Sequence, residues 1–117
     1  MKIDTIGIIG QGFVGSAVRE GMCNFVNVDT YDKDPSKNST VNDLTEIVKK
    51  NDIIFVCLPT PMRRTGECDL SIIDTVIHQI DEIAGRLNVE KITVVKSTIP
   101  PGTTANLNSD VSNIQVV

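Results

Sequence analysis

The feature that most constrains this chain is a glycine-rich turn that separates a strand-like segment from a helix-like one. Residues 3–9 form a short apolar run rich in β-branched side chains, which is typical of a buried strand. Residues 10–15 then read GQGFVG, with glycine in the first, third and sixth places. The apolar residues that follow recur at helical spacing as far as Met22. A strand, this turn and a helix in succession predict the opening unit of a parallel α/β sheet.

Strands and helices continue to alternate along the rest of the 117 residues. Apolar periodicity predicts a long helix over 70–87 and a short one over 44–50, and the Pro-Pro-Gly of residues 100–102 opens a third. Further strands are expected at residues 25–31, 39–41, 52–58, 92–95 and 114–117. With right-handed crossovers, this order predicts one domain, residues 1–117, with a doubly wound, mostly parallel sheet and helices on both faces.

Charge and cysteine content exclude several classes of function. The chain has 15 acidic and 11 basic residues, and its net charge of −4 disfavours a broad surface for nucleic acid or anionic membranes. No apolar run approaches the roughly 20 residues that span a bilayer, and Asp4 interrupts any signal-peptide core. Three cysteines without Cys-x-x-Cys spacing and a single histidine argue against a metal site. We therefore expect a cytoplasmic protein with free thiols.

Each glycine of the turn has its own physical role in binding a dinucleotide. Gly10 permits the tight turn, Gly12 leaves room for a pyrophosphate, and Gly15 allows the helix to lie close to the strand. The unpaired N–H groups of the first helical turn and the helix dipole then favour the phosphates. Glycine-rich turns are common, so the pattern is informative only because a strand precedes it and a helix follows it.

The expected cofactor depends on Asp32, which follows Gly10 at about the 20-residue spacing of the acid that binds the adenine ribose. A carboxylate there accepts both ribose hydroxyls and repels a 2′-phosphate, so NAD is favoured over NADP. Lys33 softens that preference, because a cation tolerates the phosphate. The alternative interpretation is that Asp32 only begins the turn at residues 34–36.

Two further segments follow predicted strands, at the rim where doubly wound sheets bind ligands. Residues 57–61 read CLPTP and residues 96–104 read KSTIPPGTT. Both place a threonine, Thr60 or Thr98, near a proline that stiffens the chain and removes one N–H. Ordinary helix-start chemistry also explains the proline and glycine at residues 101–102, without any ligand.

Together, residues 7–15, 55–61, 69–71 and 96–104 make the chain resemble the UDP-glucose/GDP-mannose dehydrogenase family. The resemblance implies a Rossmann-type NAD-binding domain of an enzyme of polysaccharide biosynthesis, which oxidises the C6 alcohol of a nucleotide sugar to a carboxylate. It also implies that two NAD molecules are consumed through a thiohemiacetal and a thioester on a cysteine, and that two threonines line the nicotinamide side. The expected cofactor-binding residues are Gly10, Gln11, Gly12, Phe13, Val14, Gly15, Asp32, Lys33, Leu58, Pro59, Thr60, Ser97 and Thr98.

Two departures from the family bear on function. Only residues 32–38 separate the second strand from residues 39–41, whereas a parallel crossover needs a dozen or more residues. We therefore expect a vestigial third strand and an open edge of the adenine pocket. The chain also ends at Val117, before the family's catalytic Lys, Asn, Cys and Asp, so we expect no catalysis by these residues alone.

Several reactive side chains are not expected to replace the missing nucleophile. Cys57 ends an apolar strand, where a thiol is usually inert, and two flanking acids raise the pKa of Cys68. His78 on the long helix and the pair Arg63 and Arg64 are interpreted as solvated residues.

Two other functional classes stay open. The compact connection after Asp32 also suits a 6-phosphogluconate-like hydroxyacid dehydrogenase, against which stands the segment 96–104. A non-enzymatic alternative is a nucleotide-binding or interaction module. The apolar residues 114–117 would then expose a sheet edge on which two copies pair as a homodimer.

Overall fold

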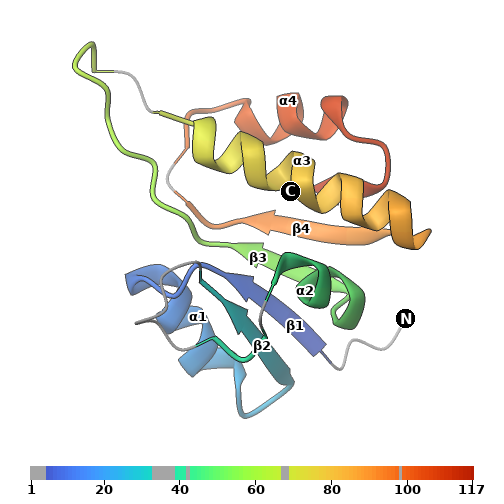
Figure 1. Cartoon of the computed structure of the whole chain (residues 1–117). Coiled ribbons are helices and arrows are strands. Elements are labelled where there is room, and N and C mark those ends of the chain that lie inside the picture. The colour runs from blue at the N-terminus through green and yellow to red at the C-terminus, as the bar shows by residue number, and fades with distance from the viewer. Residues whose placement is uncertain (1–4, 33–38, 42, 67–68, 98) are drawn as a thin grey trace.

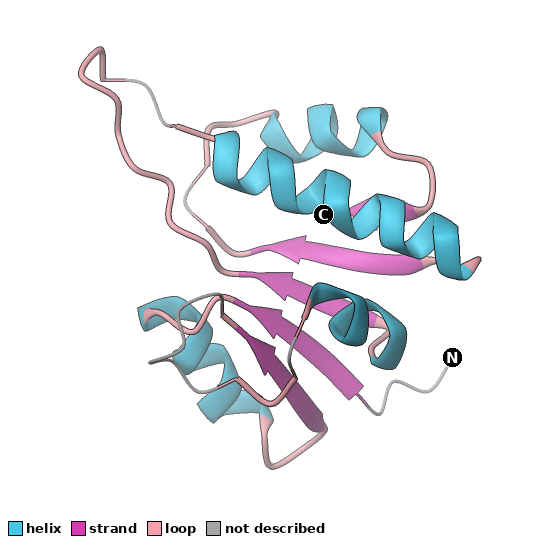
Figure 2. Cartoon of the chain, viewed as in Figure 1, coloured by secondary structure: helices cyan, strands magenta, loops and turns pink. Residues whose placement is uncertain are grey.

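The computed structural model describes residues 5–32, 39–41, 43–66, 69–97 and 99–117, with only the backbone at residues 13 and 14. Within this part of the chain, five parallel strands form one sheet in the order β2-β1-β3-β4-β5 (Figures 1 and 2). The strands are β1 (Thr5–Ile9), β2 (Asn27–Tyr31), β3 (Ile53–Val56), β4 (Lys91–Val95) and β5 (Ile114–Val116). The helices are α1 (Phe13–Met22), α2 (Leu44–Lys50), α3 (Ser71–Leu87) and α4 (Thr103–Asp110). The doubly wound α/β fold expected from the sequence is confirmed.

The helices lie on both faces of the sheet. In Figure 1, α1 lies behind the sheet near β1, and α2 and α3 lie in front of it. The handedness of the crossovers explains why α1 lies on one face and α2 and α3 on the other. The chain moves from β1 to β2 in one direction across the sheet and then through β3, β4 and β5 in the opposite direction. Right-handed crossovers in opposite directions place their helices on opposite faces. None of the described helices is both long and apolar enough to cross a bilayer.

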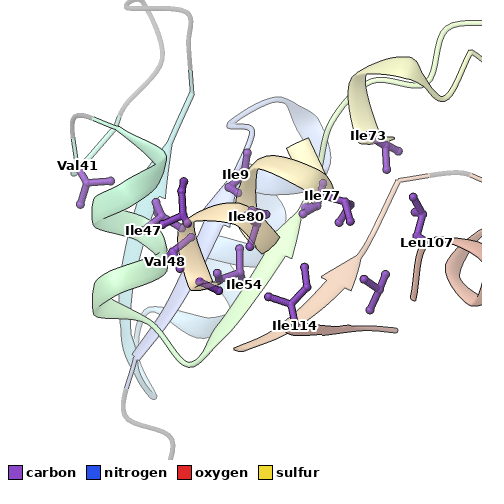
Figure 3. Packing of buried hydrophobic residues seen from close by; sticks show 14 residues of the cluster. Ile9, Val41, Ile47, Val48, Ile54, Ile73, Ile77, Ile80, Leu107 and Ile114 are labelled. Atoms are coloured by element: carbon purple, nitrogen blue, oxygen red, sulfur yellow. The ribbon is translucent and has the colours of Figure 1, made fainter. Parts of the chain in front are cut away.

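The main core lies between the sheet and helices α2, α3 and α4 (Figure 3). Helix α3 contributes the fully buried Ile73, Ile77 and Ile80, whose spacing places them on one side of the helix. They belong to one cluster with Ile47 of α2 and Ile54 of β3. Each fully buried isoleucine side chain contributes about 1.5–3 kcal/mol. This aliphatic layer therefore holds α3 and α4 over the β3-β4-β5 part of the sheet, whereas α2 lies over β1 and β2 and packs against α3.

The opposite face of the sheet is less completely covered. Side chains alternate along a strand, so Ile53 and Phe55 of β3 point away from the main core, as do Ile92 and Val94 of β4. These four side chains are half-buried. By contrast, β1, which lies against α1, is buried at four of its five positions.

Residues 39–41 do not form the short strand that the sequence suggests. They run along the outer edge of β2, where the N–H groups of Thr40 and Val41 both donate to the Thr30 carbonyl oxygen, at 2.9 and 3.3 Å. The Thr30 N–H in turn donates to the Thr40 hydroxyl at 2.8 Å. A parallel strand would form evenly spaced hydrogen bonds between backbone groups. Here the hydrogen bonds converge on the Thr30 carbonyl and on the Thr40 side chain. The expected third strand is therefore replaced by edge contacts.

Side chains from α3 and α4 hold the last strand in position. The Asp81 carboxylate accepts the backbone N–H groups of residues 112 and 113, at 3.2 and 2.7 Å. The Asn108 side-chain oxygen accepts the Val116 N–H at 2.9 Å. The next N–H, of Val117, donates to β4, and because neighbouring amides alternate in direction, the Val116 N–H points to the outer edge. Helix α4 therefore occupies part of the outer edge of β5.

Candidate functional site

The glycine turn, residues 10–15, joins β1 to α1 at the carboxyl end of the sheet. Gly10 has a φ of +95°, in the left-handed region that favours glycine, and a β-carbon on it would collide with the carbonyl oxygen of Cys57. A β-carbon on Gly15 would collide with the carbonyl oxygen of Gly10. The packing of the turn itself therefore requires both glycines.

Gly12 lies in a different environment. Its φ of −75° is open to any residue, and a β-carbon on it would meet no described atom within 4 Å. Nothing in the described fold demands glycine at this position. The missing side chain leaves space for a ligand to approach the backbone at the start of α1.

The start of α1 is arranged for an anion. Gly12 is the N-cap and provides no side-chain hydrogen bond, and the first turn contains no acidic residue. The helical hydrogen bonds begin with the Ser16 N–H, which donates to the Gly12 carbonyl at 3.0 Å. The first-turn N–H groups and the positive end of the helix dipole therefore face the space beside Gly12, as in known phosphate sites.

Asp32 lies directly after β2 and beside the turn. Its carboxylate accepts the Gln11 N–H at 2.8 Å, and its own N–H donates to the Ser39 hydroxyl at 2.9 Å. These bonds hold a carboxylate next to the space at the start of α1, the place at which the sequence predicts the ribose-binding acid. Lys33, which the sequence also assigns to this site, lies outside the described residues.

Gln11 supports the turn from inside. Its side chain is buried, and its amide nitrogen donates to the Gly10 carbonyl at 3.2 Å. The Ser16 hydroxyl donates to the Gln11 carbonyl at 3.2 Å. In the structure, this residue therefore shapes the turn through its side chain and orients Asp32 through its backbone.

One hydroxyl links the loops that follow β3 and β4. The Ser97 hydroxyl accepts the Leu58 N–H at 3.0 Å and donates to the Leu58 carbonyl at 2.6 Å. Beyond Leu58, Pro59 is exposed and Thr60 is half-buried. Thr98 lies outside the described residues. The sequence placed Leu58 and Ser97 at one rim but gave no sign of this link, because the two residues are 39 positions apart.

Cys57 lies beneath the turn and has the character of a packing residue. Its Cβ is 3.5 Å from the place where a β-carbon of Gly15 would stand. Burial raises the pKa of the Cys57 thiol to about 11, and the Lys96 ammonium offsets this only in part. Cys23 is an exposed free thiol, and Cys68 lies outside the described residues.

The other titratable residues singled out in the sequence make local contacts. His78 is exposed, and its Nδ1 lies 2.8 Å from the Asp74 carbonyl oxygen, a contact that raises the pKa of the imidazole. Arg63 lies 3.4 Å from the Asp69 carboxylate, whose pKa is lowered mainly by the hydrogen bond from the Ser71 hydroxyl. Among the described side chains, no group of three or more His, Cys, Asp or Glu is placed to hold a metal ion.

Comparisons with known proteins point to one family. The family model of the UDP-glucose/GDP-mannose dehydrogenase family, NAD binding domain, matches residues 33–115. UDP-glucose 6-dehydrogenase TuaD of Bacillus subtilis is 34% identical over 83 residues, which make up 71% of this chain and 17% of that protein. The chain therefore spans less than a fifth of the length of TuaD.

Solved structures show the same fold. A UDP-glucose dehydrogenase from the archaeon Pyrobaculum islandicum has a TM-score of 0.82 and 21% identity, covering 98% of this chain and 34% of its own. A GDP-mannose dehydrogenase from Pseudomonas aeruginosa has a TM-score of 0.79 and 21% identity, covering 95% of this chain and 34% of its own. At this identity the likeness establishes the fold.

The matched family domain is defined by NAD binding, and the described residues fit that cofactor. Space beside Gly12, uncapped amides at the start of α1 and a carboxylate at Asp32 lie together at the carboxyl end of the sheet. The family match also favours the nucleotide-sugar enzymes over the hydroxyacid dehydrogenases. The chain belongs to the UDP-glucose/GDP-mannose dehydrogenase family, whose NAD-binding domain it forms.

Proposed function

We propose that the cofactor-binding residues expected from the sequence together form an NAD site, with residues 1–117 acting as one binding domain. The first-turn amides of α1 bind the pyrophosphate beside Gly12, Asp32 binds the adenine ribose, and the loops at Thr60 and Thr98 lie on the nicotinamide side. Bound NAD supplies a hydride acceptor. The observation that carries this proposal is the open space at Gly12, because the described fold has no need of glycine there.

The test is a thermal-unfolding titration of the chain with NAD and with NADP. Free NAD at 100 times its Kd stabilises the folded state by about 2.7 kcal/mol, which corresponds to on the order of 10 °C in Tm for a domain of this size. Gly12→Val should abolish the shift and leave the unliganded chain folded, because the new side chain fills the space for the pyrophosphate. A larger shift with NADP, or NAD binding by the folded variant, contradicts the assignment.

Gly21 provides a matched control for this substitution. It lies in the same helix, α1, and a β-carbon on it would also meet no described atom within 4 Å. Gly21→Val should therefore keep the NAD shift, because this position is far along the helix from the first-turn amides. Loss of the shift in both variants would show that Gly12→Val acts through the helix rather than through the phosphate site.

We propose that, in the complete enzyme, this domain serves the oxidation of a nucleotide sugar at C6 to a carboxylate, a step that supplies sugar acids for polysaccharide biosynthesis. The support comes from relatives named UDP-glucose 6-dehydrogenase and GDP-mannose 6-dehydrogenase. Residues 1–117 bind NAD without turnover in this proposal. NADH formation by this chain alone, from NAD and UDP-glucose or GDP-mannose, would contradict it.

We also propose that the protein acts in the cytoplasm. Cys23 and Cys57 are free thiols, which suits a reducing compartment, and the domain requires a pool of NAD. Cell fractionation with an antibody to the chain tests this location, and recovery in an extracellular fraction would contradict it.

A further proposal is a homodimer that forms along the outer edge of β5. Edge strands present backbone groups to other chains, and Gln115 and Val117 are exposed there. Asn108 already binds one outward amide, so it competes with pairing. Light scattering that shows only monomer at high protein concentration would contradict the dimer.

A further inference from the structure

The carboxyl ends of β3 and β4 are joined by one side chain. The Ser97 Oγ lies 3.0 Å from the Leu58 nitrogen and 2.6 Å from the Leu58 carbonyl oxygen, so it accepts from one and donates to the other. A serine hydroxyl has a single proton to donate, and the Leu58 carbonyl takes it. Both backbone polar groups of Leu58 are therefore satisfied by this one distant side chain.

This contact takes the place of the next step in the strand pairing. Regular pairing of β3 with β4 runs to Val56, whose carbonyl accepts the Lys96 N–H at 2.9 Å. The residue after Leu58 is Pro59, which has no N–H to extend a ladder. Leu58 is thus the last residue before the segment that follows β3 leaves the sheet, and the two hydrogen bonds with Ser97 hold it in place there.

Leu58 is also held from the other side, by the glycine turn. The Cys57 N–H donates to the Ile9 carbonyl at 2.9 Å, which attaches the preceding residue to β1. The Leu58 Cδ2 lies 3.3 Å from the place where a β-carbon of Gly10 would stand. Leu58 therefore lies between the turn and the Ser97 hydroxyl. These contacts fix its backbone position, and so fix where the segment that follows it begins.

We propose that Ser97 is a positioning residue: it sets the path of residues 58–60 toward the nicotinamide half of NAD, and it acts through Leu58 rather than by touching the cofactor. This inference rests on the NAD site proposed above. The adenine half of that site uses the glycine turn and Asp32. Loss of the hydroxyl therefore weakens the binding of NAD but leaves the binding of ADP, which lacks the nicotinamide ribose, unchanged.

The first experiment compares the Kd values of NAD and ADP by calorimetry in the wild-type chain and in Ser97→Ala. We expect NAD to bind about tenfold more weakly, the scale of one net hydrogen bond, and ADP to bind as before. Ser97→Thr keeps the hydroxyl and should restore NAD affinity. Ser109→Ala is the matched control, because it removes an exposed hydroxyl whose hydrogen bond among the described residues lies within its own helix, to the Asn106 carbonyl, and it should change neither Kd.

Hydrogen exchange in the unliganded chain separates positioning from direct contact with NAD. The Leu58 amide should be protected in the wild type and in Ser109→Ala, and it should exchange faster in Ser97→Ala because its acceptor is gone. Equal protection of Leu58 in the wild type and Ser97→Ala overturns the proposal, and so does an equal loss of NAD and ADP binding. A wild-type chain that binds neither NAD nor ADP refutes the NAD site itself, and the positioning role falls with it.

Discussion

A glycine can serve the fold or a ligand, and at the scale of single residues the surroundings of the missing side chain distinguish the two. At Gly10 and Gly15 a β-carbon would meet backbone oxygens, which cannot move aside as the end of a flexible side chain can. At Gly12 there is no such neighbour in the described structure. The sequence motif presents the three glycines as equals, and only the packing around them separates their roles.

Alanine substitutions should reproduce this difference in stability. We expect Gly10→Ala and Gly15→Ala to lower the free energy of unfolding by at least about 1–3 kcal/mol, the cost of a strained backbone. Gly12→Ala should cost less, about 0.5–1 kcal/mol, because it loses only the preference for glycine over alanine at the N-cap of α1. Urea unfolding of the unliganded chain measures all three, and a greater loss at Gly12 than at Gly10 would contradict the interpretation.

The two described thiols should differ in reactivity. Because burial raises the pKa of Cys57 to about 11, this thiol stays protonated at pH 8, and its alkylation should be slow and should rise with pH toward that value. Cys23 is exposed and should react first. Iodoacetamide labelling followed by peptide mass spectrometry measures both rates. If Cys57 is labelled as fast as Cys23 at pH 8, the Cys57 thiol is not buried as described.

At the scale of elements, helices and strands whose apolar residues recur at a regular spacing were predictable. Contacts between residues far apart in the sequence were not. The apolar stripe predicted a helix over 70–87, and α3 spans Ser71–Leu87. The glycine turn and its acid were found in the same way, because their spacing is local. The short connection before residues 39–41 predicts only a vestigial strand there, and the structure has none. The contacts that these residues make with Thr30 instead depend on partners about ten positions away and could not be predicted. The link between Ser97 and Leu58 leaves no periodic trace at all.

The attachment of β5 to α3 gives a test at this scale. The Asp81 carboxylate accepts two backbone N–H groups just before β5, so Asp81→Ala should lower the free energy of unfolding by about 1–3 kcal/mol. Asp81→Asn keeps an acceptor oxygen and should lower the free energy of unfolding by less than Asp81→Ala does. Glu82→Ala, at the exposed neighbouring position, is the control. Urea unfolding measures the series, and an Asp81→Ala variant as stable as Glu82→Ala would contradict the role of this anchor.

At the scale of the whole molecule, both outer strands have neighbours that limit pairing with other chains. Residues 39–41 bond to the outer edge of β2, and the Asn108 side chain accepts the outward amide of Val116 on β5. Any association by strand pairing must displace one of these contacts. The state of association is therefore sensitive to the side chains beside the edges and not only to the strands themselves.

Removal of the Asn108 side chain tests this dependence. Asn108→Ala frees the outward amide of Val116, so the proposed dimer should form at a lower protein concentration than in the wild type. Asn106→Ala, an exposed asparagine on the same helix, is the control. Analytical ultracentrifugation measures both. Unchanged association in Asn108→Ala would mean that the edge of β5 is not the dimer interface.

The unequal covering of the two sheet faces bears on which positions can vary. Ile54 of β3 is sealed under α2 and α3, whereas its neighbour Phe55 lies half-buried on the other side. A polar group forced into the sealed layer loses its water without gaining partners. On the half-buried face the same group keeps part of its hydration. Saturation mutagenesis of β3 and β4 should therefore find that polar substitutions are tolerated at every second residue. The tolerant positions, such as Phe55 and Val94, should alternate with buried positions that are not tolerant.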